Sequence, residues 1–588
     1  MTFTATIEQE LTKTTITGER KVEWVAGDLI NINGAEYAAS PKAPASKAVF
    51  MHRNGSVPQA PYRAIYPATL YTAKGYELPS TITYEDGKLN TPMYAESDTE
   101  ELSFKNICGV LCLSLAGTEK VKSISVTADK NICGPFTVET AEDGTVSMAL
   151  TGADTDANKS VTLDFGENPI ELYNNYLENV PHNDLAAKFY IPIPKGTYNH
   201  LVITVAIDNV PKPELRKVST ESITIETNTL YTLDWDIVVP IAEQLSYVFR
   251  DMADNQPKFA VASGEATMSG QIEDNPFLPA IHTWEYNYAA IEKIDHLMYM
   301  FDEQETVQGW TASELRVFRA LLYFELFKTY GEIPILPGTT PLSFGEIVEF
   351  ITSELDSDYG GAMAGLPESY ETVELGNGIE ITRPTIWAAM SLLARTGLYY
   401  YSPLFYKGDI NILYKHKAVD YYEKIVNNGP FRLLDEYLYW WGGTDEMGGY
   451  FDEYDNLVNN ELIFAARYTG PYFEGVYPSQ SQIDLYGPDC YSDNRSYCIF
   501  DWSDYTPTKC PLKKGIATGK NTHVLPIFRY GAILLELAEL TGGPQFMNEV
   551  QRRAKTLQTP YSEEECFNER RRELAYEGQY FWDVRRLK

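Results

Sequence analysis

The chain has 588 residues and a formal net charge of −34, from 48 Lys and Arg against 82 Asp and Glu. This charge excludes nucleic acid as a partner, because a phosphate backbone would be repelled and no basic stripe offsets the repulsion. A hydrophobic content of 44% with 22% charged residues predicts a globular protein of two or three domains. No run of 18 apolar residues occurs, so no transmembrane helix is predicted.

Residues 1–238 carry the pattern of an all-β region. Phe3, Ala5 and Ile7 alternate with polar residues, and the apolar run at 29–32 ends at an Asn-Gly pair, which favours a tight turn. Further runs have the length and spacing of strands in a β-sandwich, and they lie at 111–115, 123–126, 189–193, 201–207 and 230–237. We therefore expect a β-sandwich region, either as one sandwich or as two sandwiches divided near residue 118.

Four segments of this region follow in order: VEWVAGD at 22–28, YRAIYP at 62–67, FKNICGVL at 104–111 and FYIPIP at 189–194. The set resembles the fimbrillin family of Bacteroidetes. The resemblance implies two transthyretin-like β-sandwiches and a role as a shaft, anchor or tip subunit of pili, with other fimbrial subunits as partners. Shaft subunits of that family donate a strand to a neighbour's sheet, and no certain donor strand is visible in this sequence.

The pattern changes from strands to helices between Ile237 and Pro240. An amphipathic stripe runs from Trp284 to Met298, and a second helix at 314–329 is ended by Gly331. Further helices are predicted at 344–357, 384–400, 412–427, 525–541 and 545–556. Residues 239–588 therefore form a predicted mostly helical domain, in which paired helices suit repeats of about 34 residues, as in tetratricopeptide-like folds.

The last segment, 562–588, predicts a further helix with an unusual arginine. Ser562 and Glu565 have the spacing of a capping box at the helix start, and Gly578 is a natural stop. Arg571 falls between Phe567 and Leu574 on one stripe of this helix. Two alternatives follow: an internal ion pair with a carboxylate of another helix, or a guanidinium that extends to water.

The same segment contains NERRRELAYEGQ at 568–579, followed by WDVRR at 582–586. It resembles the ERRxELAxEGxRxxDLRR signature of the SusD/RagB family, and segments 314–336, 383–405 and 459–464 agree in order. The matching signature positions, expected to be structural, are Glu569, Arg571, Glu573, Glu577, Asp583 and Arg585. Family members are surface lipoproteins of Bacteroidetes that capture glycans or peptides above a TonB-dependent transporter. The resemblance thus implies an outer-membrane, surface-exposed protein with a SusC-like transporter as partner.

Some features depart from the family pattern. This sequence contains neither an export signal nor a lipid-bearing cysteine, the segment before Trp284 is short, and family members usually continue beyond Lys588. Fusion behind a fimbrillin-like region is also unusual. A truncated or fused gene product without intact function therefore stays open as an alternative.

Patterns of catalytic and metal-binding residues are missing from the sequence. The seven histidines are scattered, and no G-x-S-x-G elbow, phosphate-binding loop or dinucleotide-binding glycine pattern occurs. Asp154 to Asn158 resembles the start of a calcium loop, but Lys159 stands where its glycine is needed. Among the seven cysteines, two of Cys490, Cys498 and Cys510 could form a bridge. We predict a non-enzymatic protein without cofactor or metal.

Aromatic residues set among glycines are the strongest ligand-binding signal. They lie in two segments and comprise Tyr439, Trp440, Trp441, Tyr468, Tyr472 and Phe473. Their aperiodic placement predicts loops, and flat rings beside amides and carboxylates suit the faces of sugars. The alternative is that these rings pack an insertion onto the helices.

The sequence therefore predicts surface capture of a glycan, or of a peptide, for a TonB-dependent transporter. A fimbrial accessory or tip adhesin is the structural alternative. An exo-acting hydrolase is a third, since a pair of facing carboxylates is all that a glycosidase needs and carboxylates are abundant.

Overall fold

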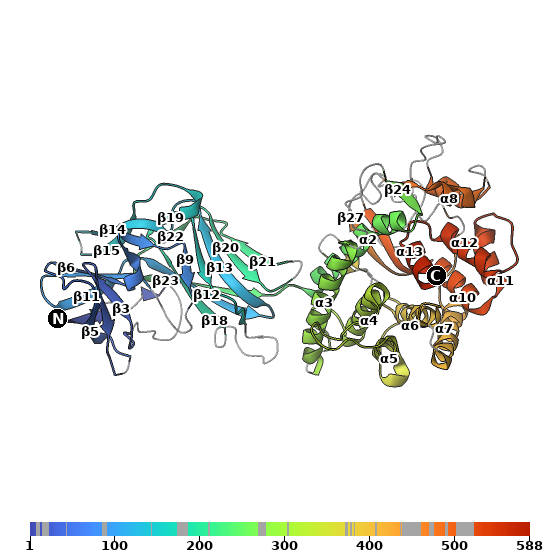
Figure 1. Cartoon of the computed structure of the whole chain (residues 1–588), viewed down its shortest axis with the longest axis horizontal. Helices are drawn as coiled ribbons and strands as arrows, with labels where there is room; N and C mark the ends of the chain where they lie inside the picture. The colour runs from blue at the N-terminus through green and yellow to red at the C-terminus, as the bar shows by residue number, and fades with distance from the viewer. Residues whose placement is uncertain are drawn as a thin grey trace. The chain divides into compact units, whose positions relative to one another are not determined.

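The protein is described here by a computed structural model (Figure 1). The chain divides into two compact units, Met1–Val239 and Pro240–Lys588, and each unit is treated by itself. The structure describes residues 1–7, 12–13, 23–42, 44–84, 91–142, 144–172, 186–209, 212–268, 278–302, 305–370, 374–376, 379–381, 383–405, 408–434, 437, 460–469, 476–487, 492–500 and 522–587. A few side chains within these ranges, that of Tyr468 among them, lie outside the description.

The first unit begins with a closed seven-stranded barrel. Around the barrel the strands follow the order β1 (Thr2–Ile7), β11 (Glu101–Asn106), β10 (Met93–Ser97), β6 (Tyr62–Tyr66), β3 (Leu29–Ile32), β4 (Ala35–Ala39) and β5 (Lys47–Asn54). Phe3, Ala5 and Ile7 alternate into its core, as their spacing predicts. Trp24 packs there edge-on against Phe50 at a centroid distance of 5.0 Å. Pairing of β1 with both β5 and β11 closes the barrel.

The remaining strands of this unit form further sheets around a second hydrophobic core. One sheet has the order β18 (Ala187–Ile193), β12 (Gly109–Gly117), β23 (Thr229–Ile237) and β2 (Thr12–Lys13). Another has β21 (Glu214–Val218), β20 (Leu201–Ile207), β13 (Lys120–Ala128), β16 (Ser160–Asp164) and β9 (Thr81–Thr83), with β17 (Ile170–Glu171) beside β13. The others join β15 (Val146–Leu150), β14 (Gly134–Thr140), β8 (Gly75–Leu78) and β7 (Tyr71–Thr72), and β19 (Gly196–Tyr198) with β22 (Ile223–Ile225).

The predicted β-rich character of this unit is confirmed, but its first part is a closed barrel and not an open sandwich. Alternation along a strand reports which face is buried and says nothing about whether the sheet closes. Strands from both sides of residue 118 also share sheets: β8 pairs with β14, and β9 pairs with β16. The two hydrophobic cores of this unit are therefore not separated at residue 118 of the chain.

The second unit is mainly helical. Its helices are α2 (Ile241–Ala262), α3 (Leu278–Met298), α4 (Ala312–Tyr330), α5 (Phe344–Leu355), α6 (Ile386–Tyr401), α7 (Asp409–Asn428), α8 (Gln480–Ile483), α9 (Asn494–Ile499), α10 (Tyr530–Thr541), α11 (Pro544–Arg553), α12 (Glu563–Glu573) and α13 (Gln579–Leu587). Consecutive helices from α2 to α7 pack against each other, as Figure 1 shows. The predicted helical domain is thus confirmed, and its tetratricopeptide-like character stays a prediction. None of the described helices is both long and apolar enough to span a bilayer.

Local signals explain where these helices begin and end. Thr311 and Glu314 form a reciprocal capping box at the start of α4, and Gly331, with a φ of +85°, follows its end. The predicted helix at 525–541 is wrong over its first residues, since α10 begins at Tyr530. The preceding residues form β29 (Thr522–Arg529), which pairs with β27 (Leu462–Thr469).

Short strands complete this unit. β27 and β29 belong to a four-stranded sheet with β26 (Ile379–Ile381) and β25 (Glu374–Gly376). β24 (Ala266–Met268) pairs with β28 (Val476–Pro478). Of the two segments with predicted aromatic residues, one precedes β27 in the sequence. The other begins at the end of β27 and leads to β28.

Candidate functional site

Helix α12 positions two carboxylates in the interior of the second unit. Ser562 Oγ accepts a hydrogen bond from Glu565 N at 3.1 Å, so the helix begins where the sequence predicts. It ends at Glu573, before Gly578, and Tyr576 in the following turn has a φ of +61°. Glu569 and Glu573, one helical turn apart, are both completely buried.

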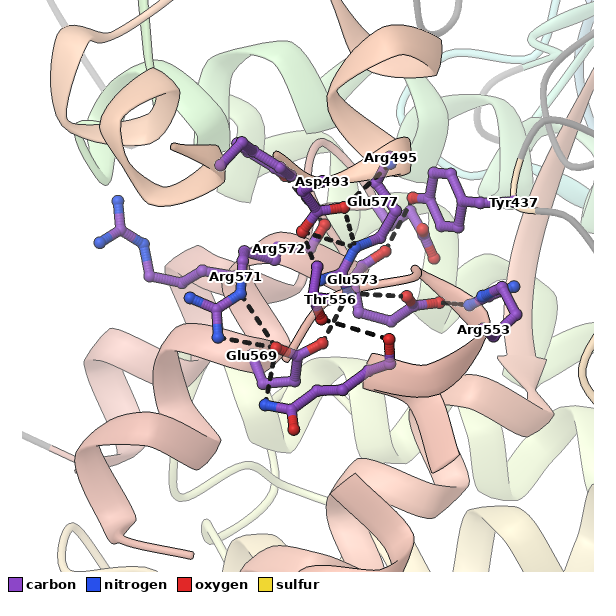
Figure 2. A network of polar contacts seen from close by, with 12 residues as sticks. Tyr437, Asp493, Arg495, Arg553, Thr556, Glu569, Arg571, Arg572, Glu573 and Glu577 are labelled. Carbon is purple, nitrogen blue, oxygen red and sulfur yellow. Dashed lines mark hydrogen bonds and ion pairs between the residues drawn. The ribbon is translucent and has the colours of Figure 1, made fainter. Parts of the chain in front are cut away.

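A network of arginines and carboxylates surrounds Glu569 and Glu573 in the interior (Figure 2). We call this network, including the two glutamates, the Glu573 cluster. Its members are Glu461, Asp493, Arg495, Arg529, Arg553, Glu569, Arg572, Glu573 and Glu577. They come from α9, α11, α12, the end of β29 and the residues that flank these elements, together with Glu461, which directly precedes β27. The network therefore joins parts of the chain that are distant in sequence.

Glu573 lies at the centre of the cluster. Its carboxylate pairs with Arg529 Nη1 at 2.7 Å, with Arg495 Nη1 at 3.1 Å and with Arg553. Burial by itself would raise the pKa of the Glu573 carboxyl, but these three guanidinium groups lower it to about 2. Glu573 is therefore ionised at neutral pH and has no proton to donate.

The other carboxylates of the cluster are held in the same way. Glu569 Oε1 lies 2.6 Å from Arg495 Nη1, and its Oε2 lies 2.7 Å from Arg572 Nη2. Burial opposes ionisation of Glu569, but Arg495 and Arg572 give a net lowering of its pKa. Arg529 also bonds Glu461 at 2.7 Å. These carboxylates are held in ion pairs with arginines. They do not form the pair of a general acid and a general base that a glycosidase needs.

A second group, the Asp583 cluster, lies on α10, α12 and α13. Arg570 Nε and Arg586 Nη2 contact the Asp583 carboxylate at 2.9 and 2.8 Å. Arg586 also bonds both oxygens of Glu539, at 2.6 and 2.7 Å. Asp583 is thereby fixed between two arginines in the interior.

Arg571 does not have the role that its position between Phe567 and Leu574 predicted. Its guanidinium donates to Gln482 Oε1 at 3.1 Å and lies 4.4 Å from the centroid of the Tyr580 ring. It is partly buried, and no ion pair of Arg571 occurs within the described part of the chain. The internal ion-pair prediction is thus corrected: the neighbours Arg570 and Arg572 carry the ion pairs.

The helical geometry explains this correction. Residues two apart on an α-helix differ by about 200° in direction, so Arg571 points away from the face that holds Glu569 and Glu573. Phe567 and Leu574 were used to predict which face of α12 is buried. That prediction fails for Arg571, because the buried face of this helix carries charged residues. Arg585, another signature position, is exposed and donates to the carbonyl of Thr329 at 2.6 Å.

The predicted aromatic residues are described only in part. Tyr439, Trp440, Trp441, Tyr472 and Phe473 lie outside the described residues. The prediction that Tyr468 lies in a loop is wrong, because its backbone lies in β27, paired with Ile379 and His523 of the neighbouring strands. Their role in ligand binding therefore stays a prediction.

The predicted bridge among the late cysteines is also untested. Cys490, Cys510 and the side chain of Cys498 lie outside the description, while Cys108, Cys112, Cys133 and Cys566 are buried. At the loop that resembles a calcium site, Lys159 Nζ lies 3.0 Å from Asp154 Oδ1. The ammonium group of Lys159 thus offsets part of the negative charge of this loop.

The described residues of the second unit also border two hollows. A cavity of about 60 Å³ lies between α2, α4, α6, β29 and α13, and the amide of Gln256 lines it. A larger groove of about 760 Å³ lies between the ends of α6, α10, α12 and α13, with Tyr401, Tyr561 and Phe567 on its walls. The groove has a volume in the range of ligand-binding sites.

Comparison with known proteins identifies the C-terminal part of this unit. Residues 406–588 match the SusD family, in a stretch that contains every member of the Glu573 cluster. The C-terminal region of this helical unit is therefore of the SusD/RagB type. Proteins of the SusD glycan-binding family are non-enzymatic, in agreement with the prediction for this chain. No curated protein matches the chain.

Solved structures of SusD-like proteins are similar to more than half of the chain. A SusD-like protein from Bacteroides fragilis shares 18% identity, with 60% of this chain and 87% of that chain covered and a TM-score of 0.43. A laminarin-binding SusD-like protein shares 17% identity, with 60% and 92% covered and a TM-score of 0.45. Surface glycan-binding protein A from Bacteroides uniformis shares 16% identity, with 58% and 87% covered and a TM-score of 0.45.

Proposed function

We propose that this protein captures a glycan at the cell surface and delivers it to a SusC-like, TonB-dependent transporter in the outer membrane. The observation that carries the proposal is the SusD family match over 406–588. This stretch includes both aromatic segments and every member of the Glu573 cluster. An oligosaccharide is the preferred ligand, and a peptide is the alternative.

The chemistry of the Glu573 cluster argues against a catalytic role for its carboxylates. A glycosidase needs one carboxyl group that holds a proton and one that is ionised. Three arginines lower the pKa of Glu573 to about 2, and Asp583 is likewise paired with two arginines. These groups therefore suit a structural frame, and the hydrolase alternative finds no support among them.

We assign the ligand platform to Tyr439, Trp440 and Trp441 with Tyr468, Tyr472 and Phe473. Six rings in two glycine-containing segments offer flat apolar faces to sugar C–H groups, while nearby amides and carboxylates can bond hydroxyls. Each ring that stacks on a sugar should contribute about 0.5–1.5 kcal/mol beyond its burial. Loss of one ring would then weaken binding several-fold.

Isothermal titration against a panel of oligosaccharides tests this function, with thermal melting run beside it. Trp440→Ala and Trp441→Ala should weaken binding and leave the melting temperature nearly unchanged. A large fall in melting temperature with binding retained would show that the rings pack the protein interior. The groove lined by Tyr401, Tyr561 and Phe567 would then be the next place to examine.

A fimbrial accessory or tip adhesin is the second candidate function. The resemblance of 22–28, 62–67, 104–111 and 189–194 to fimbrillins supports it, and its partners would be other fimbrial subunits. Strand exchange between subunits would give a ladder of denaturation-resistant species on gels. The neighbouring genes separate the candidates: a transporter gene immediately upstream favours glycan capture, and a run of fimbrial genes favours the adhesin.

A further inference from the structure

The groove between the ends of α6, α10, α12 and α13 has walls that are mainly apolar. Its volume of about 760 Å³ lies in the range of pockets that hold a ligand. Leu398, Leu540 and Cys566 line it and are almost fully buried, so the groove borders on the hydrophobic core. Tyr401 and Phe567, both partly buried, add aromatic rings to its walls. An apolar side chain of a ligand can therefore be buried there.

Every charged residue that lines the groove in the described chain is a glutamate. Glu539 is already paired through both of its oxygens with Arg586. Glu563 and Glu564 line the groove from the first turn of α12, and both are exposed. No ion pair of either residue occurs within the described part of the chain. The groove therefore offers two negative charges that a ligand can neutralise.

The surroundings of the aromatic walls favour positive charge over negative charge. Burial raises the pKa of Tyr561, which also lines the groove, to about 12, and the carboxylates of Glu539 and Glu563 act in the same direction. An ammonium group already lies beside one of the rings, since Lys415 Nζ is 4.6 Å from the centroid of Tyr401. The net charge of −34 on the whole chain adds to this preference.

We propose that this groove is a second ligand site, for a peptide segment in which an apolar side chain lies next to a lysine or arginine. The apolar side chain would lie beside Leu398 and Leu540, and the cation would pair with Glu563 or Glu564. An oligosaccharide suits these walls less well, because its hydroxyl groups need hydrogen-bond partners that leucine side chains do not supply. None of the residues that line the groove belongs to the two aromatic segments, so this site goes beyond the proposed function.

The test measures binding of three fluorescent peptides with blocked ends to the full chain by fluorescence anisotropy. Their sequences are Lys-Leu-Phe-Leu-Lys, Glu-Leu-Phe-Leu-Glu and Lys-Ser-Ser-Ser-Lys, which separates the effect of charge from that of apolar side chains. We expect the first peptide to bind most tightly and each of the others to bind about tenfold more weakly or less. Added salt should weaken binding of the first peptide, because it screens the carboxylates.

Two matched double variants locate the site. Glu563→Gln with Glu564→Gln removes two charges from the groove and should weaken binding of the first peptide roughly fivefold. Asp420→Asn with Glu423→Gln removes two exposed charges of α7 that do not line the groove, so it changes the net charge equally and should leave binding unchanged. Phe567→Ala should also weaken binding, and melting curves of all variants show whether the chain is folded.

Equal losses in the two double variants would overturn the site, because binding would then report only the overall charge. Equal binding of the Lys and Glu peptides would also overturn it, as would the absence of binding by all three. Displacement of the first peptide by an oligosaccharide of the panel would assign the groove to sugars and contradict the peptide site. Glycan capture is tested separately by Trp440→Ala and Trp441→Ala, so either proposal can fail without the other.

Discussion

Arg529 and Glu577 form a bidentate ion pair in which Nε and Nη2 of the arginine lie 2.8 and 2.9 Å from the two carboxylate oxygens. Both side chains are buried. The pair joins the last residue of β29 to the turn between α12 and α13. Such a pair holds its two elements in register, because the fork of the guanidinium matches the carboxylate in only one orientation.

Removal of one partner should be costly. Glu577→Ala leaves the buried Arg529 guanidinium with fewer acceptors, so we expect a loss of about 3–5 kcal/mol in the free energy of unfolding. Urea denaturation of the full chain followed by circular dichroism measures this loss. Glu564→Gln, on the exposed first turn of α12, is the control and should change stability by less than about 0.5 kcal/mol.

Adjacent residues on α12 should differ sharply in their contribution to stability. Arg570→Ala leaves the buried Asp583 carboxylate paired with Arg586 alone and should cost about 3–5 kcal/mol. Arg571→Ala removes a hydrogen bond to a neutral amide and a contact with an aromatic ring, and should cost only about 1–2 kcal/mol. Equal losses in parallel denaturation experiments would show that Arg571 has an ion-pair partner after all.

Stability should fall at acidic pH because of the Glu573 cluster. The pKa of Glu573 is lowered in the folded protein from 4.5 to about 2, so its contribution is present above the unfolded pKa and is lost as pH falls toward the folded value. The window therefore lies between about pH 5 and pH 2 and corresponds to about 3 kcal/mol. Denaturation midpoints at pH 7, 5 and 3 check this. Glu573→Gln should flatten the profile in this window, and an unchanged slope would contradict the assignment to Glu573.

The two units should fold independently. Their hydrophobic cores are separate, with core residues between 3 and 239 in the first unit and between 241 and 582 in the second. Limited proteolysis should therefore cut first near Ile237 and Pro240, where the pattern changes from strand to helix. Fragments 1–239 and 240–588 should each give a cooperative melting transition. An unfolded second fragment would show that its core is incomplete without further residues.

Local sequence signals predicted the fold where a boundary depends on a few neighbouring residues. The helix predicted at 314–329 is found as α4, because Leu315, Phe318, Leu322 and Leu326 recur at helical spacing and pack into the core. The same reasoning failed at β29 and α10, since the apolar run that passes from one into the other is interrupted at their junction by a single charged residue, Arg529. Pairing with β27, some sixty residues earlier in the chain, makes the first part a strand.

The sequence motif at 568–586 was recognised, but the ion-pair partners of its residues were not predicted. Arg495 and Arg529 are 78 and 44 residues from Glu573, and no local pattern joins them. A search for apolar residues also chooses the wrong face of α12, whose interior side carries Glu569 and Glu573. Closure of the barrel by the parallel pairing of β1 with β11 is likewise invisible to strand periodicity.

Gly578, in the turn after α12, should be difficult to replace for two separate reasons. Its φ is +72°, and a Cβ at this position would lie 3.0 Å from Gln256 Cγ on α2. Gly264 gives a matched control, because its φ is +79° while an added Cβ would meet no atom within 4 Å. Gly264→Ala should therefore cost about 1–2 kcal/mol from backbone strain alone.

Gly578→Ala should combine that strain with overpacking against the buried Gln256 side chain, for a total of about 2–4 kcal/mol. Denaturation curves of both variants measure the difference, which isolates the effect of the close approach. Gln256→Ala in the Gly578→Ala background should recover part of the loss, because it removes the atom that the new Cβ would meet. Equal losses in Gly264→Ala and Gly578→Ala would show that Gln256 moves aside freely and that strain alone requires glycine in this turn.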